Sequence, residues 1–225
     1  MHLLLITIIP SIIILSVFIF SDKFKEPNKA IMKVFGYGLL ICIPAFILNT
    51  YLNDYWFYQT KVPEELISSF LVPALVEEGL KFSVLYYVVY KMREFNEPMD
   101  GIVYGVTVSL GFATLENIYY VFFAGFEDPL GVAYLRAFSA VPAHALFGVF
   151  MGYFFMKYSF VKRNNSLFSA YFISYFLHAY YNYFAVINHY FMFFGLIVGW
   201  IIAFKLFINL KNNQKNKKYE HEKKI

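Results

Sequence analysis

Six ionisable side chains lie in otherwise apolar stretches of this sequence, and their types could support chemistry. They are Glu77, Glu78, Lys81, Glu116, His144 and His178. Two adjacent carboxylates beside a cation can supply one general base and one metal ligand or proton donor. Imidazoles add groups that stabilise an oxyanion or bind a metal. This set is typical of hydrolysis by an activated water, and equally of proton or metal transport.

The composition indicates that membrane-spanning segments carry these residues. Of 225 residues, 60% are hydrophobic and only 15% are charged, against about 25% charged residues in a soluble domain. A core of this size cannot hide so much apolar surface, so most of it must face a lipid bilayer. The net charge is only +4, and the basic residues form short clusters between apolar runs, so nucleic acid is not an expected partner.

The sequence predicts an all-α, polytopic membrane helix bundle. A spanning helix needs about 20 mainly apolar residues, and seven such runs are present. They are Leu3–Phe20, Ile31–Leu52, Leu66–Tyr90, Gly101–Ala124, Val132–Met156, Leu167–Ile187 and Tyr190–Leu210. We expect one integral membrane domain over residues 1–210 and a solvated basic tail over residues 211–225.

The basic residues predict the orientation of the bundle. Most of the 19 lysine and arginine residues fall in the first, third and fifth joints and near the C-terminus. Because basic residues of short loops stay in the cytoplasm, the N-terminus should lie outside and the C-terminus in the cytoplasm.

The ionisable residues share one depth in the predicted bundle. At about 1.5 Å per residue, Glu77 and Glu78 lie roughly 17 Å and His144 roughly 18 Å from the outer ends of their spans. Glu116 lies roughly 22 Å and His178 roughly 16 Å from the cytoplasmic ends. Ionisable groups at this depth are costly and usually face a bundle interior. We therefore expect them to meet at one site.

Other polar residues allow simpler interpretations. Lys81 and Glu77 could form a buried ion pair that only fixes the packing of their helix. Arg136 lies near the outer end of its span. It could anchor the helix there or belong to the site, and its position favours neither role. Asp100 precedes Gly101 and is predicted to be the N-cap of the fourth span.

Several protease classes do not fit the sequence. The zinc-binding string H-E-x-x-H is missing, and the predicted spans contain no interior pair of Asp residues. Ser109 stands in Val-Ser-Leu-Gly, and not between glycines as in a nucleophile elbow.

Four motifs in order resemble one known family. They are Val76-Glu77-Glu78-Gly79-Leu80-Lys81, Phe112-Ala113-Thr114-Leu115-Glu116, and the segments around His144 and His178, accompanied by Asp100-Gly101. Over residues 73–182 the chain resembles the PrsW family of bacterial intramembrane proteases, which belongs to the broader group that includes the CAAX prenyl proteases.

The resemblance implies a multi-pass protein of the bacterial cytoplasmic membrane. It implies site-1 cleavage of a single-pass anti-sigma factor, which frees a sigma factor in a stress response. The catalytic set would be Glu77, Glu78, Glu116, His144 and His178, with Lys81 as charge partner. Asn182 follows His178 as in the H-x-x-x-N pattern of the CAAX group and is a provisional member.

The cofactor stays open at this point. Glu78 is the expected general base, with His144 and His178 stabilising an oxyanion. These same three residues could instead hold a divalent metal such as zinc. The competing function is a proton- or cation-coupled transporter, which buried Glu, His and Lys residues would also suit, although no inverted repeat is visible. A receptor would not need so many ionisable groups at one level.

Overall fold

The computed structural model describes residues 2–216, and within them the chain forms helices and loops without strands. The predicted all-α class is therefore confirmed. The helices are α1 (His2–Ser21), α2 (Asn28–Gln59), α3 (Glu64–Leu66), the π-helical turn η1 (Ile67–Leu71), α4 (Pro73–Tyr87), the 3-10 turn η2 (Val89–Lys91), α5 (Pro98–Phe122), α6 (Pro129–Phe138), α7 (Ala140–Ser159), α8 (Asn165–Ile187) and α9 (His189–Asn216).

Five helical segments of the described chain are long and apolar enough to cross a membrane: α1, α2, α5, the α6–α7 pair and α9. The two predicted spans outside this set contain α4 and α8, which carry Glu77, Glu78 and His178. Helix α4 has only 15 residues, and α8 includes several Ser, Asn and Tyr residues. The multi-pass character is thus supported, while the count of seven spans stays a prediction.

Two of the predicted spans are interrupted helices, although the α6–α7 pair that forms the fifth run is still long and apolar enough to cross a membrane. The third run breaks at Val72, where the backbone has φ −122° and ψ −76°, just before Pro73 begins α4. Proline lacks a backbone N–H and fits the first turn of a helix, so it starts α4 and cannot continue the preceding turn. The fifth run breaks at Ser139 between α6 and α7.

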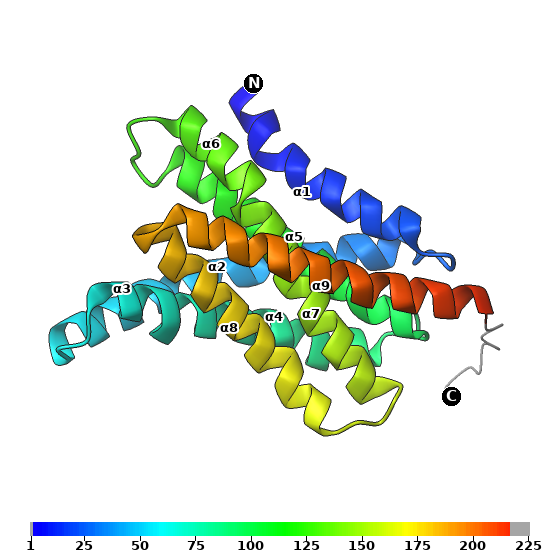
Figure 1. The fold of residues 1–225 in the computed structure, drawn as a ribbon. Coiled ribbons are helices and arrows are strands. Elements are labelled where there is room, and N and C mark those ends of the chain that lie inside the picture. The colour runs from blue at the N-terminus through cyan, green and yellow to red at the C-terminus, as the bar shows by residue number, and fades with distance from the viewer. Residues whose placement is uncertain (1, 217–225) are drawn as a thin grey trace.

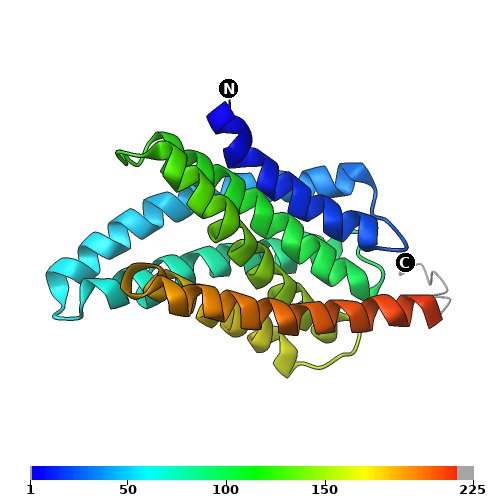
Figure 2. The same cartoon turned by 45° about the horizontal axis from the view of Figure 1, so that its top comes forward.

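The loops gather at two opposite ends of the bundle (Figure 1). The α1–α2, α4–α5 and α7–α8 joints lie at the end where α9 finishes. The α2–α3, α5–α6 and α8–α9 joints lie at the other end, as Figure 2 also shows. This alternation agrees with the basic joints sharing one side, and the predicted orientation of the N-terminus stays a prediction.

The start of α5 differs from its predicted form. The helix begins at Pro98, Glu97 holds the N-cap position, and Asp100 is the third helical residue. Asp100 Oδ2 accepts hydrogen bonds from the backbone N–H groups of Asn96 at 2.7 Å and Glu97 at 2.8 Å. Asp100 therefore does cap the helix, from the N3 side of a capping box and not as the N-cap residue.

The end of α9 extends into the predicted tail. The helix continues to Asn216, and the side chain of Gln214 is buried against the α1–α2 loop and the start of α5. Residues 217–225, with the remaining lysines of the predicted tail, lie outside the described residues.

Helix α5 is the centre of the bundle, because it is almost entirely buried and packs against α7, α2 and α1. Glycines make its close crossing with α7 possible. A Cβ on Gly105 would lie 2.4 Å from the carbonyl oxygen of Gly148, and one on Gly152 would lie 2.0 Å from that of Gly101. Small residues at such crossings let two helix backbones approach each other. The crossing sets the spacing of the helices that carry Glu116 and His144.

We expect Gly105→Ala to destabilise the bundle, because the new methyl group would collide with backbone that cannot rotate away. Overpacking of this kind costs about 1–3 kcal/mol. The thermal unfolding midpoint of the purified protein in detergent should fall. The control is Gly36→Ala in α2, where an added Cβ meets nothing within 4 Å. Equal midpoints for the two variants would contradict the proposed close packing.

Candidate active site

The six predicted residues meet in the interior of the bundle. Helix α4 supplies both adjacent glutamates and the lysine, while α5, α7 and α8 each supply one further residue. All six side chains are buried, and Glu78 and Lys81 have no exposed surface. The structure therefore brings the six residues together, while their shared depth in the membrane and their catalytic role stay predictions.

Lys81 is the centre of the hydrogen-bond network. Its Nζ lies 2.7 Å from Glu78 Oε1, 3.0 Å from His144 Nδ1 and 3.9 Å from Glu77 Oε2. It also lies over the ring of Phe112, 4.3 Å from the centroid. An ammonium only donates hydrogen bonds, so His144 Nδ1 must accept one. Lys81 thus binds the two glutamates of its own helix and also orients a histidine from α7.

This contact fixes the tautomer of His144. Since Nδ1 accepts, the proton is on Nε2, which lies 2.9 Å from Glu116 Oε2 and donates to it. A continuous chain of hydrogen bonds therefore runs from Lys81 through His144 to Glu116, and it connects α4, α7 and α5.

His178 is held by Glu78 on the other side of the cluster. The Nδ1 atom lies 2.9 Å from Glu78 Oε1, so Nδ1–H donates to this carboxylate. The ring stacks on Phe147 with centroids 4.9 Å apart. Its Nε2 atom faces Glu77 Oε2 at 3.9 Å, which is too long for a direct hydrogen bond. One imidazole nitrogen therefore remains available toward Glu77.

Glu77 is the least engaged of the three carboxylates. Its Oε1 accepts a hydrogen bond of 3.1 Å from the side chain of Asn49 on α2, while its Oε2 is buried and has no hydrogen-bond partner among the described residues. Asn49 was not among the predicted site residues. An amide within the apolar run Ile31–Leu52 was the signal that could have identified it.

Arg136 is part of the network and does not merely anchor its helix. It donates to Glu116 Oε2 through Nη2 and to Asn117 Oδ1 through Nε, both at 2.7 Å. Its guanidinium also lies over the ring of Tyr120 at 4.1 Å. The break at Ser139 separates its short helix α6 from α7. Asn117 is a second residue that the sequence reasoning missed, although it directly follows Glu116.

Asn182 lies one turn beyond His178 on α8 and is half-buried. Its side chain makes no hydrogen bond within residues 2–216, so it stands outside the network of the other predicted residues.

Three of these side chains could hold a metal ion. One ligand atom from each of Glu77, His144 and His178 lies within 4.8 Å of the other two. The buried, unpartnered Glu77 Oε2 and the available His178 Nε2 fit such a role, and Glu78 would orient His178 from behind. The glutamate of this group is Glu77, whereas the sequence reasoning selected Glu78.

Comparisons with known proteins show the family to which the chain belongs. A family model described as PrsW family intramembrane metalloprotease matches residues 26–209. The chain belongs to the PrsW family of intramembrane metalloproteases. It is 38% identical to the protease PrsW of Geobacillus kaustophilus over 176 residues, which cover 77% of this chain and 75% of that one. It is 34% identical to the protease PrsW of Clostridioides difficile over 231 residues, covering 100% and 94%.

A third PrsW relative, from Bacillus subtilis, is 38% identical over 151 residues, or 67% of this chain and 66% of the relative. No solved structure matches the chain. The PrsW membership supports an intramembrane endopeptidase in a multi-pass bacterial membrane protein. It decides against the transporter hypothesis, which the sequence alone had left open.

We expect Arg136→Gln to reduce peptide cleavage by about 10- to 100-fold, which is typical of residues that orient a catalytic ligand from behind. The charge that holds Glu116 against His144 would be lost. Arg136→Lys should recover part of the activity, because it keeps the charge but cannot bind Glu116 and Asn117 together. Cleavage is measured on a tagged membrane-embedded substrate.

The control for this series is Arg163→Gln, at an exposed loop position. A role limited to helix anchoring would instead lower the unfolding midpoint without any rescue of activity by lysine. Wild-type cleavage by Arg136→Gln would contradict the positioning role.

Proposed function

We propose that this protein cleaves a single-pass membrane protein by means of a water activated at Glu77. The observation that carries the proposal is the buried Glu77 Oε2, which has no partner among the described residues and faces an available His178 nitrogen at 3.9 Å. A general base must have a lone pair that is free to accept a proton. Glu78 Oε2 is likewise buried without a partner among the described residues, but Glu78 is held by Lys81 and His178 through its other oxygen, whereas Glu77 accepts only one hydrogen bond, from Asn49. We therefore assign the base to Glu77, and not to Glu78, the base favoured by the sequence alone.

Glu78 acts as the positioning carboxylate in this proposal. Its Oε1 already accepts hydrogen bonds from both Lys81 and His178. Proton acceptance there would weaken the ion pair with Lys81 and release the His178 ring. Glu78 therefore keeps the available His178 nitrogen directed toward Glu77.

The reaction proceeds in two steps at these residues. Glu77 Oε2 accepts a proton from a water, and the oxygen of that water attacks the scissile carbonyl carbon. The proton then passes to the leaving amide nitrogen as the C–N bond breaks. The ammonium of Lys81, 3.9 Å from Glu77 Oε2, stabilises the negative charge that develops nearby. His144 is kept in position by its contacts with Lys81 and Glu116.

Glu77, His144 and His178 are also the residues that would hold a divalent metal such as zinc. When bound, such a metal acts as a Lewis acid on the carbonyl and lowers the pKa of water. His144 would have to exchange one of its two hydrogen bonds for the metal, whereas His178 Nε2 is already available.

The proposed substrate is a membrane-anchored anti-sigma factor, whose site-1 cleavage would release a sigma factor in a stress response. The family resemblance supports this assignment. The Glu116 and Arg136 side chains are 11% and 14% exposed, whereas Glu78 and Lys81 are fully buried. Glu116 and Arg136 belong to the two helices joined by the α5–α6 loop, at the bundle end that is predicted to lie outside the cell (Figure 1).

Replacement of Glu77 tests the proposed base. Glu77→Gln should lower cleavage of a co-expressed single-pass substrate by about 100-fold or more, because the amide cannot accept the proton. Glu78→Gln and His178→Ala should also abolish cleavage without loss of the folded protein. Glu65→Gln, at an exposed position, is the control. Normal cleavage by Glu77→Gln would refute the role of Glu77. The proposed substrate would be refuted if the protein cleaved other single-pass membrane proteins but left anti-sigma factors intact.

Metal content separates the two forms of the mechanism. If a metal is bound at the site, mass spectrometry of the purified wild-type protein should find about one divalent ion, such as zinc, per chain. The Glu77→Gln and His178→Ala variants should lose this ion. Chelation should then stop cleavage. Full activity in metal-free protein would show that the Glu and His residues suffice on their own.

A further inference from the structure

A second buried acidic cluster lies at the opposite end of α5 from Glu116. It contains four carboxylates from three parts of the chain: Asp22 after α1, Glu26 in the α1–α2 loop, and Glu97 and Asp100 at the start of α5. Their exposed fractions are 3%, 7%, 3% and 0%. Along α5, Asp100 is about 24 Å from Glu116. The cluster is therefore separate from the candidate active site.

Each of three acids in this cluster has an oxygen without a partner. Gln214 Nε2 donates to Asp22 Oδ1 and Glu97 Oε1, and the helix start uses Asp100 Oδ2. The remaining oxygens, Asp22 Oδ2, Glu97 Oε2 and Asp100 Oδ1, are buried without a hydrogen-bond partner among the described residues. One oxygen of each acid lies within 4.8 Å of those of the other two.

Gln214 provides independent evidence for a ligand. It belongs to α9, is only 2% exposed, and reaches the cluster through its amide group. Its Oε1 is also buried without a partner in the described chain. A buried amide oxygen without a donor is costly. This neutral oxygen acceptor at the acids is what a bound cation would satisfy.

The described part of the chain brings no lysine or arginine into an ion pair with these acids. Lys23 donates to the backbone oxygen of Gln214 at 3.4 Å, and Lys25 lies over the ring of Phe20. The carboxylates therefore repel one another out of water, and burial raises the pKa of Glu97 to about 7. A cation at this place would remove that repulsion.

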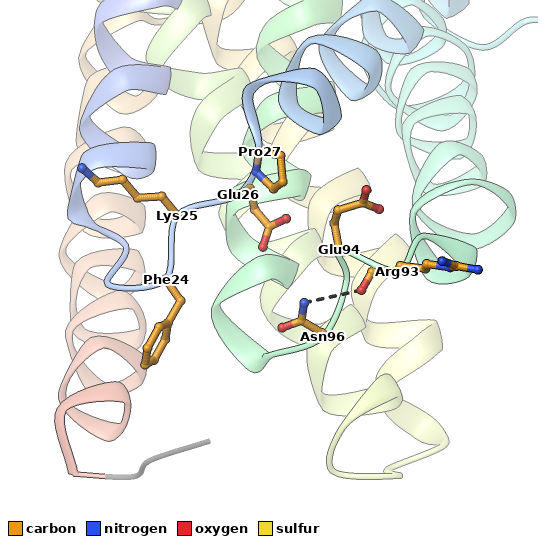
Figure 3. Close-up of a pocket in the computed structure, with 7 residues that line it drawn as sticks. All are labelled: Phe24, Lys25, Glu26, Pro27, Arg93, Glu94 and Asn96. Atoms are coloured by element: carbon orange, nitrogen blue, oxygen red, sulfur yellow. Dashed lines mark hydrogen bonds between the residues drawn. The ribbon is translucent and has the colours of Figure 1, made fainter. Parts of the chain in front are cut away.

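A cavity of about 330 Å³ borders the cluster at Glu26, although the other three acids and Gln214 do not line it. It lies between the α1–α2 loop and the loop before α5, and Glu26, Glu94 and Asn96 are among its lining residues (Figure 3). Figure 3 shows the Lys25 side chain directed away from Glu26. Glu26 also interacts electrostatically with Asp100 in the cluster. The cavity is large enough for a hydrated ion to enter.

We propose that Asp22, Glu97, Asp100 and Gln214 bind a hard divalent cation, Mg²⁺ or Ca²⁺. All four ligands are oxygens, which these ions prefer, and the cluster lacks the His and Cys ligands typical of zinc. The bound ion ties the end of α9 to the end of α1 and the start of α5. It therefore stabilises the bundle at this end and takes no part in hydrolysis.

Thermal unfolding of the full chain in nanodiscs tests this site. The protein carries Glu77→Gln so that the active-site group does not contribute, and it is first treated with EDTA. Added MgCl₂ or CaCl₂ should raise the unfolding midpoint, by roughly 5 °C at 100 times Kd. NaCl of equal ionic strength should not. No shift with either divalent cation would overturn the proposal.

Variants locate the effect. Asp22→Asn with Glu97→Gln should remove the cation-dependent shift while leaving the metal-free midpoint at or above that of the parent, because repulsion is reduced. Gln214→Glu should lower the metal-free midpoint and increase the shift. The matched control is Glu94→Gln, which changes an acid of the cavity outside the ligand set and should keep the full shift. A full shift in the Asp22→Asn, Glu97→Gln variant would also overturn the assignment.

Discussion

The buried ammonium of Lys81 is the charge on which the arrangement of the candidate active site depends. A lysine with no exposed surface is costly unless it is paired and hydrogen-bonded. Here it pairs with Glu78 from its own helix and donates to His144 from α7. Because Lys81 and His178 both bind Glu78 Oε1, that glutamate is fixed in place, whereas the adjacent Glu77 accepts only one hydrogen bond, from Asn49. One cation thus makes two neighbouring glutamates chemically different.

This network requires helices at fixed distances, and the backbone supplies them through glycine. The α5–α7 crossing places carbonyl oxygens where even a methyl group would collide, at Gly105 and Gly152. The crossing holds Glu116 within 2.9 Å of His144. The breaks at Val72 and Ser139 act on the same site, because each comes shortly before a residue of the candidate site, Glu77 on α4 and His144 on α7. Packing and chemistry are therefore specified by the same short segments.

Most residues of the candidate site were predictable from the sequence, and for a physical reason. Ionisable residues are so rare in apolar helices that Glu77, Lys81 and His178 identify themselves by position alone. Helical periodicity also predicted that Lys81 would meet both glutamates. The amide partners of Glu77 and Arg136 were harder to predict, because the contacts of Asn49 and Asn117 depend on how separate helices rotate against one another. The division of labour between Glu77 and Glu78 likewise depends on which oxygen Lys81 and His178 contact.

The two polar centres at opposite ends of α5 differ in how they handle charge. At the catalytic end, Lys81 and Arg136 each pair with a carboxylate, so the cluster is nearly balanced without any added ion. At the other end, the described chain gives Asp22, Glu97 and Asp100 no such partner, and only the amide of Gln214 joins Asp22 and Glu97 to α9. Unpaired buried carboxylates oppose the approach of the elements that carry them. In the proposed site, a divalent cation bound by these acids would offset this repulsion and hold the end of α9 more firmly against α1 and α5.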